Sequence, residues 1–580
     1  MHATASGPTL PPSRAEPPRI PKWSSAAALE PTISQSTSQR LQLDAVSRAP
    51  RSSNPTTVPP SIESPAQRPF GQARPRKTSL RPVSEEHITM SSSISVSSSA
   101  STERKVDPRV LAAIQKASPP RPAVLNPLLR MLVFQVFFLS TSLVKIPWYL
   151  LRSIIPRFRL NPNWSFATAA YILVVRRVMR NLIRFGVQPI APRKGGLRDR
   201  NHFLGTLVAC LNLSGPGGSV VLAKQSIKAL KLDAKHGRAD KVWIPPAGPE
   251  YLDGILAVKT SPNDKRRITT DAYTGPPLLD PKWLKWSIRA LWFTHKPEIV
   301  PPQPRATTKP SRPVICYFHG GAGVTFNAGD AHMGMNLAKT FARNAGIDLF
   351  SVDYNLAPFA PSPVQLYQAV SAYLYLINEL KYSPEQIYIG GDSHGSWMTL
   401  QLERYLRSYK HVVFDDPASF KIPGLVLLSP WIAPEDLSFK SREKNVDTDI
   451  IALSYEEWGV SAQGLKKLPY PLSDPWSTHS NKSIGELAAM PPCFIANGGG
   501  ETLLDEGTHF ANLMRKAKNL PTSTSSQRIV LSPGELNCKV VHHVYPHEVH
   551  DYFTVDTEVA NAIKVYKQIG TWIKFTQTLL

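Results

Sequence analysis

GDSHG, at residues 391–395, is the stretch that decides the fold. Residues 388–390 before it form an apolar run typical of a short buried strand, and residues 396–409 after it have helical character without proline. A serine in a G-x-S-x-G turn between a strand and a helix is the pattern of a nucleophile elbow, in which small neighbours let strand and helix pass close beneath a strained serine. The other interpretation is a plain glycine turn. The rest of the chain favours the elbow, with Ser393 as the nucleophile.

From about residue 241 onward, short apolar runs alternate with longer helical segments. This alternation predicts an α/β fold with a mostly parallel central sheet that helices cover on both faces. Residues 435–486 break the pattern, as a helical cap over a substrate site would, and the polar residues 520–537 are expected to form a surface loop. The expected strands are residues 242–244, 255–258, 314–318, 347–352, 388–390, 424–428, 493–496 and 540–545, and the expected helices are residues 364–380, 396–409, 504–518 and 559–575.

A serine hydroxyl is a weak nucleophile at neutral pH, so it needs a base within hydrogen-bond reach and an acid that orients the base. After an elbow of this kind the chain order is serine, acid, histidine. His550 lies between the last expected strand and the last expected helix, in a loop at the carboxyl end of the sheet, and is the predicted base. His547 is the nearest rival, whereas His542 and His543 fall inside the strand and are expected to be structural.

The predicted acid is Glu501, which directly follows three glycines at the carboxyl end of the strand expected over residues 493–496. Asp505 is the alternative. Asp505 and Glu506 fall in the first turn of the next expected helix, where acids often serve only as partners of the helix dipole.

A tetrahedral intermediate carries a negative oxygen that needs backbone N–H donors. The sequence HGGAG follows a buried strand, begins with His319 and Gly320, and contains glycines that leave N–H groups unshielded. The donors should be the amides of Gly321 and Ala322. The amide of His394, the residue after the nucleophile, should complete this oxyanion hole.

HGGAG, DYNLAP at residues 353–358, GDSHG, LLDEG at residues 503–507 and a histidine in the final loop together resemble the hormone-sensitive-lipase-like group of the α/β-hydrolase fold. The resemblance covers the chain from about residue 241 to its C-terminus. It implies a cofactor-free esterase or lipase that acts on carboxylic esters, and it places the acid at Glu501, four residues before the Asp of D-E-G. Some members are membrane-anchored and deacetylate sterols, as a steryl acetyl hydrolase does, and the N-terminal part of this chain resembles that arrangement.

Three positions depart from the usual pattern of the group. The acid is usually Asp, and Glu501 has a longer side chain. His394 replaces the usual Ala after the nucleophile, where only the backbone amide is needed, and Trp397 stands where a small or polar residue is common, which would narrow the pocket. None of these changes removes a catalytic group, so an active enzyme is expected.

The chain before residue 241 has a different composition. Residues 1–104 are rich in Pro, Ser, Thr and Arg and are expected to form a disordered tail, either regulatory or without a specific role. Residues 105–240 are expected to be a basic, membrane-proximal helical region, in which residues 128–155 are the candidate anchor, interrupted by Pro147 and carrying Trp148. A single span, a re-entrant or interfacial anchor and a buried amphipathic helix all remain open.

The formal net charge of +24 favours an anionic partner. Residues 131–200 hold 12 Lys or Arg residues against one acid, next to the most apolar stretch of the chain, which favours a membrane surface over nucleic acid. In the helix expected to follow the anchor, one face should gather arginines that meet either anionic headgroups or solvent. These are Arg176, Arg177, Arg180 and Arg184.

The predicted function of residues 241–580, the catalytic domain, is hydrolysis of lipophilic esters with short or medium acyl chains, sterol acetates among them. The expected location is a membrane surface, that of the endoplasmic reticulum or of lipid droplets, and a soluble cytoplasmic protein is the alternative. Alternative functions are a hydrolase-like binding module without activity and a membrane-tethered interaction platform. No cofactor, metal or nucleic-acid partner is expected, since the four cysteines lack metal-ligand spacing and no nucleic-acid module is recognisable; the oligomeric state stays open.

Overall fold

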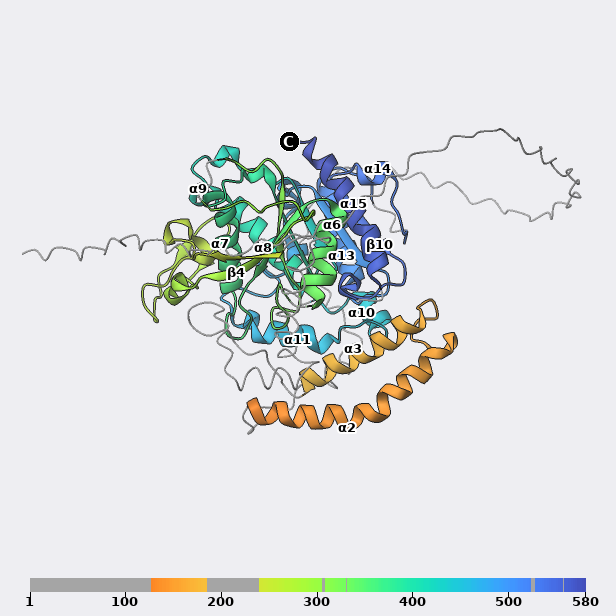
Figure 1. Ribbon diagram of the computed structural model, residues 1–580. Helices are drawn as coiled ribbons and strands as arrows, with labels where there is room; N and C mark the ends of the chain where they lie inside the picture. The colour runs from red at the N-terminus through yellow and green to blue at the C-terminus, as the bar shows by residue number, and fades with distance from the viewer. Residues whose placement is uncertain are drawn as a thin grey trace, which may run out of the picture. The chain divides into compact units, whose positions relative to one another are not determined.

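The structure is a computed structural model that describes residues 127–184, 239–304, 308–329, 331–434, 436–522, 527–555 and 558–580 (Figure 1). The tail expected over residues 1–104 and much of the region 105–240 lie outside the described residues. All described residues belong to one compact unit.

An eight-stranded sheet in the order β1-β4-β6-β5-β7-β8-β9-β10 forms the centre of this unit. Strands from β6 to β10 in this order run parallel, and β1 and β4 add an antiparallel edge. The mostly parallel sheet is therefore confirmed. The strands are β1 (Ala239–Ile244), β4 (Ile288–Phe293), β5 (Val314–Phe318), β6 (Asp348–Asp353), β7 (Ile387–Asp392), β8 (Leu425–Leu428), β9 (Cys493–Gly498) and β10 (Val540–Tyr545); β2 (Ile268–Thr269) and β3 (Thr274–Gly275) form a separate ribbon.

Helices cover both faces of the sheet because successive strand residues alternate between two buried clusters. In β5, Cys316 joins the cluster under α7, α8 and α13, and Tyr317 joins the opposite cluster under α6 and α15. The helices are α2 (Pro127–Ile154), α3 (Phe166–Arg184), α6 (Thr340–Ala345), which continues a π-helical segment (Ala331–Lys339), α7 (Val364–Asn378), α8 (His394–Ser408), α9 (Lys410–Val413), α10 (Lys440–Asn445), α11 (Leu453–Ala462), α12 (Ile484–Ala489), α13 (Leu504–Ala517), α14 (Pro533–Leu536) and α15 (Val559–Gln577).

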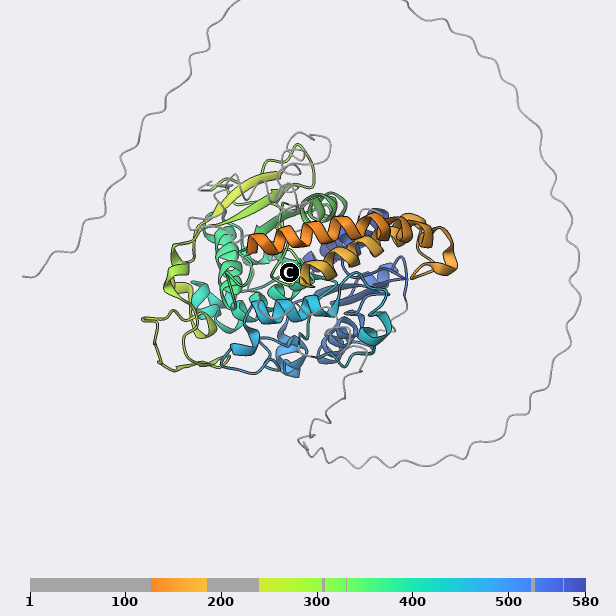
Figure 2. The ribbon, with the colours of Figure 1, turned by 90° about the horizontal axis from the view of Figure 1, so that it is seen from below.

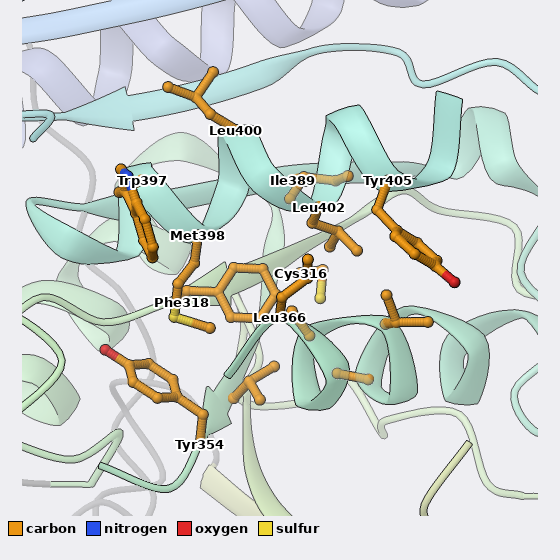
Figure 3. Close-up of a cluster of buried hydrophobic side chains, with 14 of the residues drawn as sticks. Cys316, Phe318, Tyr354, Leu366, Ile389, Trp397, Met398, Leu400, Leu402 and Tyr405 are labelled. Carbon is orange, nitrogen blue, oxygen red and sulfur yellow. The ribbon is translucent and has the colours of Figure 1, made fainter. Parts of the chain in front are cut away.

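The elbow joins β7 to α8, and α8 lies against the middle of the sheet. Met398 and Leu402 of α8 meet Cys316 and Phe318 of β5 in one buried cluster (Figure 3). Burying apolar side chains of this size stabilises a fold by about 1.5–3 kcal/mol each. The strand and the helix that carry Ser393 are therefore both fixed by the core.

Two features of the sheet were not predicted correctly. The strand expected over residues 255–258 is wrong: Gly254–Leu256 form a 3₁₀ turn, capped by the Asp253 carboxylate, and Val258 makes only an isolated bridge to Leu279. β4 was not predicted at all. Its six residues are all buried, so the polar alternation that marks a half-exposed strand is missing.

The helices α2 and α3 form a hairpin, with α3 between α2 and the helices α10 and α11 (Figures 1 and 2). Phe134 and Phe138 of α2 are buried, as is Met179 of α3, and Arg177 of α3 donates a hydrogen bond to Thr141 of α2. By length and composition alone, Leu132–Ile154 could cross a membrane.

Candidate active site

Ser393 stands at the turn between β7 and α8 with φ +53° and ψ −118°, a strained backbone for a residue with a side chain. The flanking glycines have no room for a Cβ. One added to Gly391 would lie 2.3 Å from the Gly395 carbonyl carbon, and one added to Gly395 would lie 1.9 Å from the Phe318 carbonyl oxygen. The close approach of strand and helix thus dictates both glycines and presents the Ser393 hydroxyl at the carboxyl end of the sheet.

His550 reaches this hydroxyl from the loop after β10. Its Nε2 lies 2.9 Å from Ser393 Oγ, a hydrogen-bond distance. His547, the rival candidate, is exposed, and its ring lies 3.4 Å from the Asn163 amide nitrogen of the segment before α3. His542 and His543 are buried within β10. The structure therefore brings His550, and not its rivals, to Ser393.

Glu501 follows β9 and is fully buried. Its Oε2 lies 3.5 Å from His550 Nδ1, and its Oε1 accepts a hydrogen bond from the Asn497 side chain. Asp505, the alternative acid, instead accepts the backbone N–H of Ser441 at 2.8 Å, at the start of α10. Glu501 is thus the carboxylate that faces the Nδ1 side of the imidazole.

Two further carboxylates, which were not predicted from the sequence, surround His550. Asp551 Oδ2 lies 3.1 Å from His550 Nε2, on the same side as Ser393 Oγ. Asp449 Oδ1 accepts the backbone N–H of His550 at 2.8 Å. The adjacency of Asp551 to His550 was a usable signal, whereas no sequence motif marks Asp449, which lies 101 positions away.

The carboxylates raise the pKa of the imidazole. Burial would lower the pKa of His550, but the negative carboxylates of Asp551 and Glu501 outweigh it and hold that pKa well above its usual range. Asp392, just before the nucleophile, has a pKa raised well above normal by burial and by the repulsion of Asp551. The site is therefore a buried cluster of acids around one histidine.

The HGGAG loop lies beside Ser393. Gly321 and Ala322 have φ of +104° and +53°, and the Gly320 N–H donates to Asp392 Oδ2 at 2.9 Å, which ties the loop to the elbow. Among the described residues, no acceptor takes the amides of Gly321, Ala322 or His394. These three N–H groups are available for an oxyanion.

The imidazole rings of His319 and His394, the histidines of the HGGAG and GDSHG motifs, bond groups other than Ser393. The His319 ring stacks on Tyr354, with 4.3 Å between ring centroids, and its Nδ1–H donates to the Gly320 carbonyl at 2.8 Å. The His394 ring donates from Nε2 to the Gln365 side-chain oxygen at 2.8 Å, and burial lowers its pKa to about 3. His394 is thus neutral in the core, and only its backbone is placed to serve the site.

No group of three or more His, Cys, Asp or Glu side chains with the arrangement of a metal site occurs within the described part of the chain. Cys316 and Cys493 are buried in β5 and β9, where burial raises the pKa of each thiol.

Residues 315–527 match the model of a protein family described as alpha/beta hydrolase fold. Esterase LipI of Mycobacterium tuberculosis is 25% identical over 223 residues, which are 37% of this chain and 63% of that protein. Carboxylesterase NlhH of the same bacterium is 27% identical over 217 residues, which are 35% of this chain and 61% of that protein. The chain thus spans about six tenths of the length of these relatives. A solved hyperthermophilic esterase of the archaeon Pyrobaculum calidifontis is 18% identical, with a TM-score of 0.40, and the match covers 62% of this chain and 92% of that one.

The family match confirms the α/β-hydrolase fold. The relatives named esterase and carboxylesterase confirm the resemblance to the esterases of this fold that the motifs indicated.

Proposed function

We propose that the protein is a serine hydrolase that cleaves carboxylic esters. The observation that carries the proposal is the 2.9 Å approach of His550 Nε2 to the hydroxyl of Ser393 on a strained elbow. Ester hydrolysis also needs an acid and an oxyanion hole. Glu501 lies on the far side of the imidazole, and the backbone amides beside the hydroxyl have no acceptor among the described residues.

Acylation begins when Ser393 Oγ attacks the ester carbonyl while neutral His550 takes its proton at Nε2. The carbonyl oxygen becomes negative and is bound by the amides of Gly321, Ala322 and His394. Glu501 stabilises the imidazolium across the 3.5 Å gap to Nδ1. His550 then gives its proton to the leaving alcohol, and an acyl-serine remains.

Deacylation repeats these roles with water. His550 takes a proton from water, the hydroxide attacks the acyl carbonyl, and the same three amides hold the second oxyanion. Collapse of the intermediate returns the proton from His550 to Ser393 Oγ and releases the carboxylic acid.

The proposed substrate is a lipophilic ester with a short or medium acyl chain, such as a sterol acetate, taken from a membrane surface of the endoplasmic reticulum or of a lipid droplet. The outer face of α2 supports this location, because its large apolar side chains recur every three to four residues and are exposed. Trp148 lies among them, with the exposed Lys145 nearby. They are Leu132, Val133, Val136, Leu139, Leu143, Val144, Trp148, Leu150, Leu151 and Ile154.

Since the opposite face of α2 packs on α3, an interfacial helix fits better than a lone span, and we propose that α2 lies in the membrane surface. Leu143→Glu places a charge where a side chain 79% exposed would enter lipid. Vesicle flotation with zwitterionic and anionic lipids, in high salt, should fall about tenfold or more in this variant. Gln577→Glu, an equal charge change at the exposed end of α15, is the control and should float like the wild type. Equal flotation of both variants would contradict the proposal.

Ester hydrolysis by the wild type and by Ser393→Ala tests the chemistry. Substrates should include p-nitrophenyl esters of increasing chain length and a steryl acetate in vesicles. The wild type is expected to turn over short and medium chains, and the variant to lose the activity by at least about 10⁴-fold. Hydrolysis that persists in Ser393→Ala, or a folded wild type without any esterase activity, would overturn the proposal and favour a binding module.

A further inference from the structure

The hairpin of α2 and α3 is docked onto the loops that carry the base. The indole N–H of Trp164, just before α3, donates to the carbonyl oxygen of His547 at 2.8 Å. Thr168, in the first turn of α3, donates to Glu558 at 2.5 Å. Trp164 and Thr168 are both buried. The hairpin is thus packed against the segment that leads into and out of the loop of His550.

Arg176 of α3 is a third buried contact between the hairpin and the rest of the protein. It was expected on a face that meets headgroups or solvent, and that expectation is wrong for this residue: only 6% of it is exposed. Its guanidinium spans one turn of chain, with Nη1 donating to the carbonyl of Asp449 and Nη2 to the carbonyl of Val446 at 3.1 Å. Burial lowers the pKa of Arg176 to about 10, so the group stays charged at neutral pH.

The same turn holds both the acid loop and the base loop through the Asp449 carboxylate. Its Oδ1 accepts the backbone N–H of His550 at 2.8 Å. Its Oδ2 accepts the N–H of Thr502, the neighbour of Glu501, at 2.7 Å, and the Thr502 hydroxyl at 2.8 Å. One fully buried side chain therefore fixes the backbone on both sides of the 3.5 Å gap between Glu501 and His550.

We propose that Arg176 is a positioning residue of the active site, through which the α2–α3 hairpin holds the turn of Asp449 and thereby the acid and the base. This inference rests on the proposed hydrolase function and assigns the hairpin a role in turnover beyond attachment to a membrane. A planar guanidinium suits the role because its fork of donors bonds two carbonyls in fixed geometry, which a lysine ammonium does not reproduce.

Misplacing a catalytic group by about 1 Å costs on the order of 10²-fold in rate. Loss of both Arg176 bonds should therefore lower kcat by about 10–100-fold, with KM within about twofold of the wild-type value, since Arg176 lies behind the catalytic groups and not at the substrate. A purely structural role would lower the amount of folded enzyme without this split between kcat and KM.

The experiment measures kcat and KM of the full chain on p-nitrophenyl acetate, a soluble ester, without membranes. Arg176→Met keeps an unbranched apolar stem and removes both bonds. Arg176→Lys keeps the charge. The matched control is Arg180→Met, one turn further along α3, where the side chain is exposed. Thermal unfolding of each variant reports whether it folds.

The expected order of kcat is wild type and Arg180→Met together, then Arg176→Lys, then Arg176→Met. A kcat of Arg176→Met within about twofold of the wild type, or an equal loss in Arg180→Met, overturns the inference and leaves the hydrolase function standing. If Arg176→Met does not fold, Arg176→Lys decides by the same criterion. A folded wild type without activity overturns the hydrolase function, and the inference with it.

Discussion

The elbow between β7 and α8 and the hairpin of α2 and α3 are built in opposite ways. Residues 391–395 of the elbow are buried, and its glycines lie so close to Phe318 and to each other that no side chain fits. The hairpin is buried on one face only, and the other face of α2 carries a row of exposed apolar side chains. Backbone packing thus dictates the residue types of the elbow. The residue types on the outer face of α2 depend instead on what that face contacts outside the protein.

Two histidines only three residues apart belong to the two different regions. His550 contacts Ser393 of the elbow, and His547 lies beside the segment that precedes α3 of the hairpin. His550→Ala should lower kcat for a soluble ester by about 10⁴-fold, since the general base is lost. His547→Asn should stay within about threefold, because Asn tolerates the left-handed backbone at φ +62°. Steady-state kinetics of the two variants provide the measurement. Similar losses of kcat in both variants would contradict the assignment of His550 as the base.

A methyl group added at the elbow tests how far packing dictates that region. Gly395→Ala places a Cβ 1.9 Å from the Phe318 carbonyl oxygen and should lower the free energy of unfolding by about 3 kcal/mol, because strand and helix must separate. Gly485→Ala in α12 meets nothing within 4 Å, and about 0.5 kcal/mol of stabilisation is expected from the higher helix propensity of Ala. Chemical denaturation compares the two. A Gly395→Ala protein as stable as the Gly485→Ala protein would disprove the close approach.

The acids around His550 predict a pH effect. A general base works only when neutral, and a raised pKa keeps His550 protonated to higher pH, so the acid limb of kcat/KM should lie above the usual histidine range. Asp551→Asn removes the negative charge 3.1 Å from Nε2, lowers the pKa of His550, and should move this limb about one unit toward lower pH.

Activity profiles from pH 5 to 10 measure this limb. Asp505→Asn, whose carboxylate bonds Ser441 instead, is the control and should leave the limb in place. A limb unmoved by Asp551→Asn would show that Asp551 does not govern the imidazole.

Much of the fold could be predicted because the elbow and its neighbours obey local rules. Seven of the eight strands of the large sheet were expected within a few residues, since apolar runs bounded by turns mark them. The strand predicted over residues 255–258 is wrong because Gly254, at φ +56°, begins a 3₁₀ turn there. The predicted cap over residues 435–486 forms α10, α11 and the start of α12, and Gln463, just after α11, donates to the Ala322 carbonyl at 3.1 Å. Its role over substrate stays a prediction.

The site could be predicted only where a motif marks it. Ser393, Glu501 and His550 were found from chain order and motif spacing, and the structure brings them together. Asp449 and Arg176 could not be found, because their importance arises from contacts between residues 101 and 273 positions apart, which no local pattern encodes. The arginine face of α3 looked uniform in sequence, and only packing distinguishes the buried Arg176 from the exposed Arg180.

Every step of the proposed ester hydrolysis depends on Ser393 being an activated nucleophile. Reaction of the full chain with a fluorophosphonate, followed by peptide mass spectrometry, locates any phosphonyl adduct. We expect one adduct, on Ser393, that is absent in Ser393→Ala and forms far more slowly in His550→Ala. No adduct on the folded wild type, or an adduct on another residue, would contradict this role of Ser393.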